Sequence, residues 1–144
     1  MATDRRAEVR WQGSLMEGAG TIVSTTSGAI GEQAVSWPNR AEDSPTATSP
    51  EELIAAAHAA CFSMALSHAL AQGGNAPERL QTSATVTFQP GEGIRKVALS
   101  VHGRVPGIDE AAFREAAEGA KQNCPVSKAL AGVPEMTLDA ELER

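Results

Sequence analysis

The chain has 144 residues, a length that fits one domain over residues 1–144 and leaves little room for a second. Hydrophobic residues make up 42% of the chain and charged residues 21%, which is typical of a globular protein and argues against a disordered one. The net charge is −6, there is no cluster of Lys or Arg, and only 3% of the residues are aromatic, so we do not expect nucleic acid as a partner.

We do not expect a membrane partner either, because His and Ser interrupt the longest apolar stretch, residues 53–70. The first residues lack the basic and apolar regions of a secretory signal, which favours a cytoplasmic location. In that compartment a structural disulfide between the two cysteines is not expected.

The first part of the chain predicts three short strands that form an antiparallel meander. Alternating or β-branched residues between Gly, Pro and Asn turn signals mark these strands. Their expected ranges are Ala7–Gly13, Gly18–Ser24 and Gln33–Trp37. Residues 41–50 are polar and predict a loop.

A long helix is expected from Pro50 to about Gln72. Ser49 is suited to the N-cap, Glu52 completes a capping box, and Gly73 with Gly74 ends the helix. The helix is apolar nearly all round, so it should be buried. A short chain cannot cover every side of a helix about 35 Å long, so we expect a second subunit to cover the rest.

The second half of the chain predicts three further strands and two helices. Alternation marks the strands at Thr82–Phe88, Arg95–His102 and Met136–Leu142, and an apolar stripe marks the helix at Asp109–Gln122. A short helix follows Cys124, with Pro125 at its first position. The expected order is therefore β-β-β-α-β-β-α-α-β, an α+β fold.

Cys61 and Cys124 are the candidate nucleophiles, although free cysteines are often simply buried. Cys61 lies in the apolar helix and needs a nearby cation to become a thiolate, and Arg40 in the preceding loop is one candidate. Cys124 lies at a helix start, where the N–H groups and the helix dipole favour a thiolate. On electrostatics alone, Cys124 is the more acidic thiol.

Two other residues of the long helix have possible roles. His58 lies one turn before Cys61 and suits a base or a metal ligand, but a His-x-x-Cys pair is a weak zinc signal, and we favour a packing role. Glu51 lies ten residues before Cys61, a rise of about 15 Å on a regular helix. If Glu51 serves a site at Cys61, the partner subunit must supply it.

Two segments that contain the cysteines resemble the OsmC/Ohr family, most closely its OsmC branch. They are TSPEELIAAAHAACFSMALS, residues 48–67, and CPVSKAL, residues 124–130. The likeness spans nearly the whole chain, and together the two motifs are highly specific. It also includes Trp11-x-Gly13, Gly18-x-Gly20-Thr21, Ser27-Gly28, Arg40, Val105-Pro106-Gly107-Ile108-Asp109 and Thr137-Leu138-Asp139.

The resemblance implies an intertwined homodimer in which antiparallel sheets surround a long central helix, with two sites at the subunit interface. It implies a hydroperoxide reductase with Cys61 as the peroxidatic thiol and Cys124 as the resolving thiol, which reverses the electrostatic preference. Arg40 matches the active-site arginine of the OsmC branch, and Glu51 matches the acid that orients it. No metal or other cofactor is implied.

The expected substrates are organic hydroperoxides, held by apolar walls that include Phe62 and Met64, and the expected reductant is a dithiol, lipoyl-type by family analogy. Such an enzyme acts as an antioxidant in the stress response. Departures from the family pattern at Ala41 and at residues 47–49 concern substrate preference more than chemistry. The alternatives are a thiol–disulfide oxidoreductase and a non-catalytic ligand-binding dimer.

Overall fold

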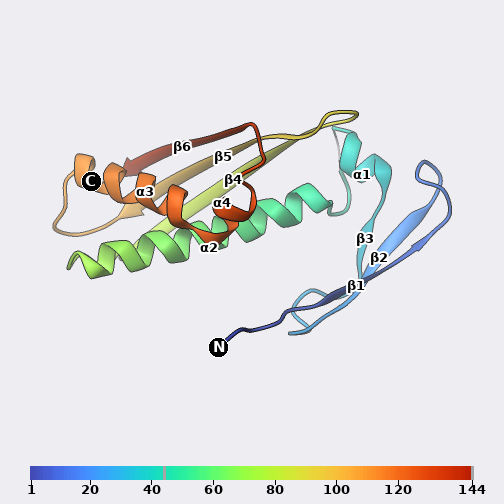
Figure 1. The fold of residues 1–144 in the computed structure, drawn as a ribbon, viewed down its shortest axis with the longest axis horizontal. Helices are drawn as coiled ribbons and strands as arrows, with labels where there is room; N and C mark the ends of the chain where they lie inside the picture. The colour runs from blue at the N-terminus through green and yellow to red at the C-terminus, as the bar shows by residue number, and fades with distance from the viewer. Residues whose placement is uncertain (44, 144) are drawn as a thin grey trace. The chain divides into compact units, whose positions relative to one another are not determined.

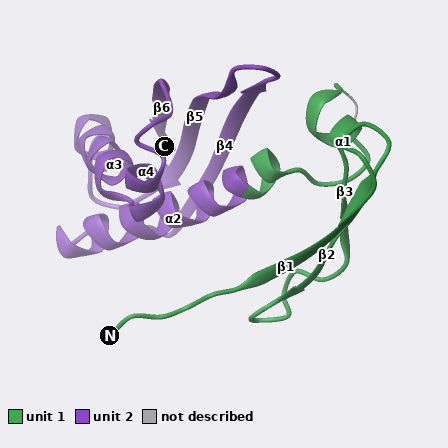
Figure 2. Ribbon diagram, turned by 45° about the vertical axis from the view of Figure 1, so that its right-hand side comes forward, with its two compact units in different colours: residues 1–53 green, residues 54–144 purple. Residues whose placement is uncertain are grey.

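The computed structural model describes residues 1–43 and 45–143 and divides into two compact units, Met1–Leu53 and Ile54–Arg144. Figure 2 shows the two units in different colours. Ser44, which falls in the predicted loop, lies outside the described residues. The single domain expected over residues 1–144 stays a prediction.

The first unit contains a three-stranded antiparallel sheet in the order β1-β2-β3. Its strands are β1 (Ala7–Gln12), β2 (Ala19–Thr25) and β3 (Gln33–Val35), which confirms the meander expected from the turn signals. Gly20 explains one close approach in this sheet, because a Cβ atom there would meet the Trp11 ring at 2.7 Å. Every residue of β1 is exposed in the single chain.

A short helix, α1 (Trp37–Ala41), follows β3 where the sequence predicted a turn and the start of a loop. Ser36 caps it by accepting a hydrogen bond from the Asn39 backbone N–H, and Pro38 lies in its first turn. Arg40 is therefore a residue of α1, and its expected position in a loop was wrong. The Ser-Trp-Pro sequence carries the signal of a helix start.

The long helix α2 spans Pro50–Gln72, as predicted. The Glu52 backbone N–H donates to Ser49 Oγ at 3.1 Å, and Gly74 adopts a left-handed backbone with φ of 89° where the helix stops. By length and composition α2 is apolar enough to cross a membrane, a property that it shares with core helices of soluble proteins. One face of α2, formed by residues at four-residue spacing, is buried in the single chain: His58, Phe62, Leu66 and Leu70.

The second unit holds the sheet β4-β5-β6, built from β4 (Arg79–Gln89), β5 (Gly93–Arg104) and β6 (Glu135–Leu142). β4 and β5 pair antiparallel, but β5 and β6 pair parallel, so the expectation of purely antiparallel sheets was wrong for this pair. The reason is the crossover through α3 (Glu110–Asn123) and α4 (Pro125–Ala129), which returns the chain to the opposite end of the sheet before β6 begins.

The core of the second unit lies between this sheet and the helices α2 and α3, which Figure 1 shows on one side of the sheet. Phe62 and Phe113 are its largest fully buried side chains. Gly103 lets β5 approach α3, because a Cβ atom there would meet the Phe113 ring at 2.5 Å. The packing holds α2 against the segment that joins α3 to α4, where Cys124 lies.

Candidate active site

The two cysteines lie together in the second unit, although 63 positions separate them in the sequence. Cys61 is on α2 and half-buried, whereas Cys124 is the fully buried residue between α3 and α4. Both are free thiols, and their side chains are hydrogen-bonded to each other. They form a pair of sulfurs within one chain that oxidation can join.

The surroundings of Cys61 oppose ionisation. Burial raises the pKa of the Cys61 thiol, and the hydrogen bond with Cys124 and the charge on that sulfur raise it further. A hydrogen bond from the Val126 backbone N–H acts in the opposite direction but is outweighed. None of these contacts with the described residues is to a cation, so a Cys61 thiolate needs a positive charge from elsewhere.

The surroundings of Cys124 favour ionisation. Burial by itself raises the pKa of Cys124, but hydrogen bonds from the Cys61 thiol, from the Ser127 backbone and hydroxyl, and from the Val126 backbone lower it overall. The two backbone donors lie in the first turn of α4, as expected for a thiol that precedes a helix. Within the isolated pair, the negative charge therefore rests first on Cys124.

Arg40 and Glu51 form a second cluster, in the first unit. The Arg40 Nε atom donates to both carboxylate oxygens of Glu51 at 3.0 and 3.2 Å, and Nη2 donates to Oε2 at 2.9 Å. The Glu51 side chain is 8% exposed and that of Arg40 33%. This forked contact holds the guanidinium in one orientation and joins the two residues within one chain.

An apolar cavity of about 180 Å³ adjoins Arg40 in the same unit. The sequence did not lead us to expect a cavity at Trp11 and Trp37, although two tryptophans in a chain with so few aromatic residues could have indicated one. The lining residues are Trp11, Leu15, Val35, Ser36, Trp37, Arg40 and Pro50.

Phe62 was expected to line the substrate pocket. This expectation was wrong, because Phe62 is fully buried in the core. Met64, the other expected wall residue, is 73% exposed in the single chain.

His58 is fully buried, and its Nε2 atom lies 2.7 Å from Ser127 Oγ. Burial lowers the pKa of His58, which keeps the ring neutral. Within the described part of the chain, no group of three or more His, Cys, Asp or Glu side chains is placed to hold a metal ion. The structure thus sets His58 beside a hydroxyl group.

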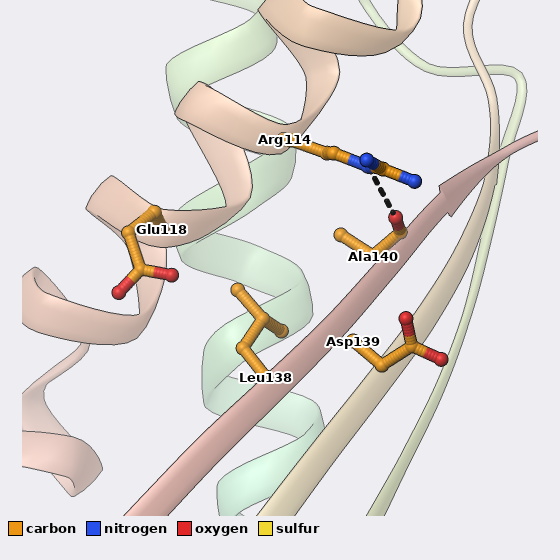
Figure 3. Close-up of a pocket in the computed structure, with 5 residues that line it drawn as sticks. All are labelled: Arg114, Glu118, Leu138, Asp139 and Ala140. Atoms are coloured by element: carbon orange, nitrogen blue, oxygen red, sulfur yellow. Dashed lines mark hydrogen bonds between the residues drawn. The ribbon is translucent and has the colours of Figure 1, made fainter.

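A larger cavity of about 310 Å³ lies between α3 and β6, and its lining includes no residue of the two clusters. Arg114 spans it and donates to the Ala140 carbonyl at 3.2 Å, as Figure 3 shows. Glu118 and Asp139 supply its other polar groups, and no thiol or imidazole lines it. We assign no chemistry to this cavity.

Residues 41–139 match the family model described as OsmC-like protein. The chain is 42% identical to peroxiredoxin OsmC of Escherichia coli over 99% of both chains. It is 30% identical to the organic hydroperoxide resistance protein OhrB of Bacillus subtilis, over 74% of this chain and 76% of that one. The superposition on the crystal structure of OhrB from B. subtilis covers 96% of this chain and 98% of OhrB, with a TM-score of 0.64 and 27% identity.

The chain therefore belongs to the OsmC-like protein family. With the thiols of Cys61 and Cys124 in contact, this membership defines a cysteine-based peroxidase, an oxidoreductase that reduces peroxide.

Proposed function

We propose that the protein reduces organic hydroperoxides to alcohols, with Cys61 as the peroxidatic thiol and Cys124 as the resolving thiol. The observation that carries this proposal is the direct contact of the two thiols inside one chain. The name of the E. coli relative, a peroxiredoxin, supports a peroxide substrate, and that of the B. subtilis relative, an organic hydroperoxide resistance protein, supports the organic class.

In the first step, the Cys61 thiolate attacks one oxygen of the hydroperoxide and the O–O bond breaks. The sulfur is oxidised to a sulfenic acid, and the alkoxide leaves and takes up a proton to become the alcohol. In the second step, the Cys124 sulfur attacks the Cys61 sulfur, the S–OH bond breaks, and hydroxide leaves as water. The two thiol protons thus end in the alcohol and in the water.

An external dithiol then reduces the disulfide by thiol exchange, and we propose a lipoyl-type dithiol for this role. The cytoplasm, where thiol reductants are abundant, is the proposed location.

Arg40, held by Glu51, is the proposed cation that stabilises the Cys61 thiolate. Glu51 and Cys61 belong to one continuous helix, and ten residues of helix correspond to about 15 Å of rise, too far for direct action. We therefore propose a homodimer in which the Arg40–Glu51 pair of each protomer faces the thiols of its partner. The exposed small residues of α2, such as Ala57 and Ala60, allow close contact between protomers.

The cavity beside Arg40 is the proposed place for the alkyl group of the substrate. Each buried methylene group contributes about 0.8 kcal/mol to binding, which favours organic hydroperoxides over hydrogen peroxide. Trp11, Trp37 and Leu15 are among the apolar residues that line this cavity.

The test is one turnover with a stoichiometric amount of cumene hydroperoxide, followed by intact mass measurement. The wild-type protein should lose two protons as the disulfide forms, Cys124→Ser should retain one added oxygen on Cys61, and Cys61→Ser should not consume the peroxide. Continued turnover by Cys61→Ser would overturn the assignment. Turnover of a disulfide substrate without any reaction with peroxide would favour the thiol–disulfide oxidoreductase, and no mass change would favour the ligand-binding dimer.

A further inference from the structure

His58 and Ser127 form a buried polar contact that the steps above do not use. His58 lies on α2 and Ser127 in α4, 69 positions later, and His58 Nε2 lies 2.7 Å from Ser127 Oγ. The ring is fully shielded from solvent, and its Nδ1 atom has no hydrogen-bond partner among the described residues. Buried polar atoms are usually paired, so an imidazole placed this way needs an explanation.

Ser127 extends the contact to the sulfurs. Its hydroxyl group is hydrogen-bonded to Cys124, which is in turn hydrogen-bonded to Cys61. The four side chains therefore form one continuous chain in the order His58, Ser127, Cys124, Cys61.

The direction of the hydrogen bonds follows from the number of protons available. A serine hydroxyl has one proton to donate, so Ser127 must accept from His58 Nε2–H if it donates to the Cys124 sulfur. A neutral imidazole with its proton on Nε2 leaves Nδ1 as a bare acceptor. The opposite tautomer would bury an unpaired Nδ1–H donor and would turn the Ser127 proton away from Cys124.

We propose that His58 is a positioning residue that fixes the Ser127 hydroxyl proton on Cys124, so that Cys124 attacks the Cys61 sulfenic acid as a thiolate. This inference rests on the proposed function of the two cysteines. Ser127 donates a hydrogen bond to the sulfur and transfers no proton to it. The S–S bond forms as the S–OH bond of Cys61 breaks, and the hydroxide leaves as water by taking up from solvent the proton that Cys124 released on ionisation.

The experiment compares Ser127→Ala, Ser127→Thr, His58→Leu and His58→Gln in single turnovers, with sulfenic acid trapped by dimedone and disulfide followed by intact mass. In Ser127→Ala and His58→Leu, disulfide formation should slow by about tenfold, the effect of losing one hydrogen bond to a charged group. Sulfenic acid formation should keep its rate or become faster, because a weaker Cys124 thiolate competes less with Cys61. Ser127→Thr keeps the hydroxyl, His58→Gln keeps a donor, and both should recover much of the rate.

Ser63→Ala is the matched control. Ser63 is a half-buried serine of the second unit whose hydroxyl group is hydrogen-bonded to the Ala59 carbonyl at 2.8 Å and to the Thr82 hydroxyl at 2.7 Å, and neither partner is a sulfur. Its removal should leave both steps unchanged. Equal slowing of both steps in Ser127→Ala, or disulfide formation at the wild-type rate, would overturn the proposal.

A second measurement separates this inference from the proposed function. In the Cys61→Ser background, the pH titration of Cys124 is followed by the ultraviolet absorbance of its thiolate, which requires no peroxidase activity. Adding Ser127→Ala should raise the midpoint by about one pH unit, whereas adding Ser63→Ala should not move it. An unmoved midpoint contradicts the role of Ser127 even if peroxide is reduced, and a raised midpoint supports that role even if it is not.

Discussion

Cys61 and Cys124 differ in the groups around them, and this difference divides their roles. Cys124 receives the backbone N–H groups of α4 and the Ser127 hydroxyl, whereas Cys61 lies on an apolar helix with weaker support. In the isolated pair, the negative charge of the first thiolate therefore lies on Cys124. Reaction at Cys61 requires a nearby cation that stabilises the Cys61 thiolate, so that the proton of the hydrogen-bonded pair lies on Cys124. This is the role proposed for Arg40.

Removing that cation should change the pH dependence of the first step. Only the thiolate attacks, and burial raises the pKa of Cys61, so the rate should rise with pH as this thiol loses its proton. Arg40→Ala should move the rising limb to higher pH by about one unit and slow the reaction by about tenfold at neutral pH. The measurement is the rate of Cys61 oxidation as a function of pH.

Arg40→Lys keeps the charge but loses the forked contact with Glu51, so an intermediate profile is expected. If Arg40→Ala retained the wild-type profile, another group would have to activate Cys61.

The positions of these residues are set by the ends of the helices as much as by their buried faces. α2 starts at a Ser49 cap and stops where Gly74 turns, and Cys124 lies between the last turn of α3 and the first turn of α4. The Cys124 backbone N–H donates to Ala120 O at 2.9 Å, while its carbonyl accepts from Lys128 N at 3.1 Å. The resolving thiol is therefore held by hydrogen bonds to two helices.

The cap of α3 offers a test at this scale. Asp109 Oδ1 accepts a hydrogen bond from the Ala112 backbone N–H at 2.8 Å. Asp109→Ala should lower the free energy of unfolding by about 1 kcal/mol, whereas Asp109→Asn, which can still cap, should lose much less. Urea denaturation at fixed protein concentration measures both values.

Glu115→Ala, a change on an exposed position of the same helix, serves as the control for loss of a carboxylate. An Asp109→Ala variant as stable as the wild-type protein would show that packing alone holds α3.

At the scale of the whole molecule, one chain leaves much of α2 uncovered. Its buried face packs into the core of the second unit, but Ala57, Ala60 and Met64 are exposed. Burial of this apolar surface between two protomers would give a dimer a large hydrophobic stabilisation. Arg40 is held by Glu51, which lies about 15 Å along α2 from Cys61 of the same chain. The proposed dimer explains how Arg40 can still act on a cysteine, because that cysteine belongs to the partner.

Mixed dimers test this arrangement directly. Cys61→Ser and Arg40→Ala protomers should each be poorly active alone, but unfolding and refolding them together should restore activity. Half of the random dimers are mixed and each mixed dimer holds one complete site, so about a quarter of the wild-type activity is expected.

The control is Cys61→Ser mixed with Cys124→Ser. Both thiols of a site come from one protomer, and each protomer in this mixture lacks one of them. No complete site can therefore form, and no full turnover should return. Absence of recovery in the first mixture, with mixed dimers shown by mass measurement, would contradict a site shared between subunits.

The sequence by itself determined features that depend on neighbours along the chain. Alternation predicted the strands, and the cap at Ser49 and the glycines after about Gln72 predicted the extent of α2. The motifs around the two cysteines identified the family and the candidate residues. The short helix α1 was missed, because Pro38-Asn39 was interpreted as a turn signal.

Only the tertiary structure decided what distant segments do to one another. The parallel pairing of β5 and β6 depends on the path of α3 and α4 across the sheet, which no local pattern contains. The contact of His58 with Ser127, and that of Cys61 with Cys124, depend on side chains brought together across more than 60 positions. The helix start after Cys124, by contrast, already predicted the more acidic thiol. Burial and hydrogen bonds between distant residues exist only once the chain has packed. Helix caps and hydrophobic periodicity, by contrast, depend on residues that are close in the sequence.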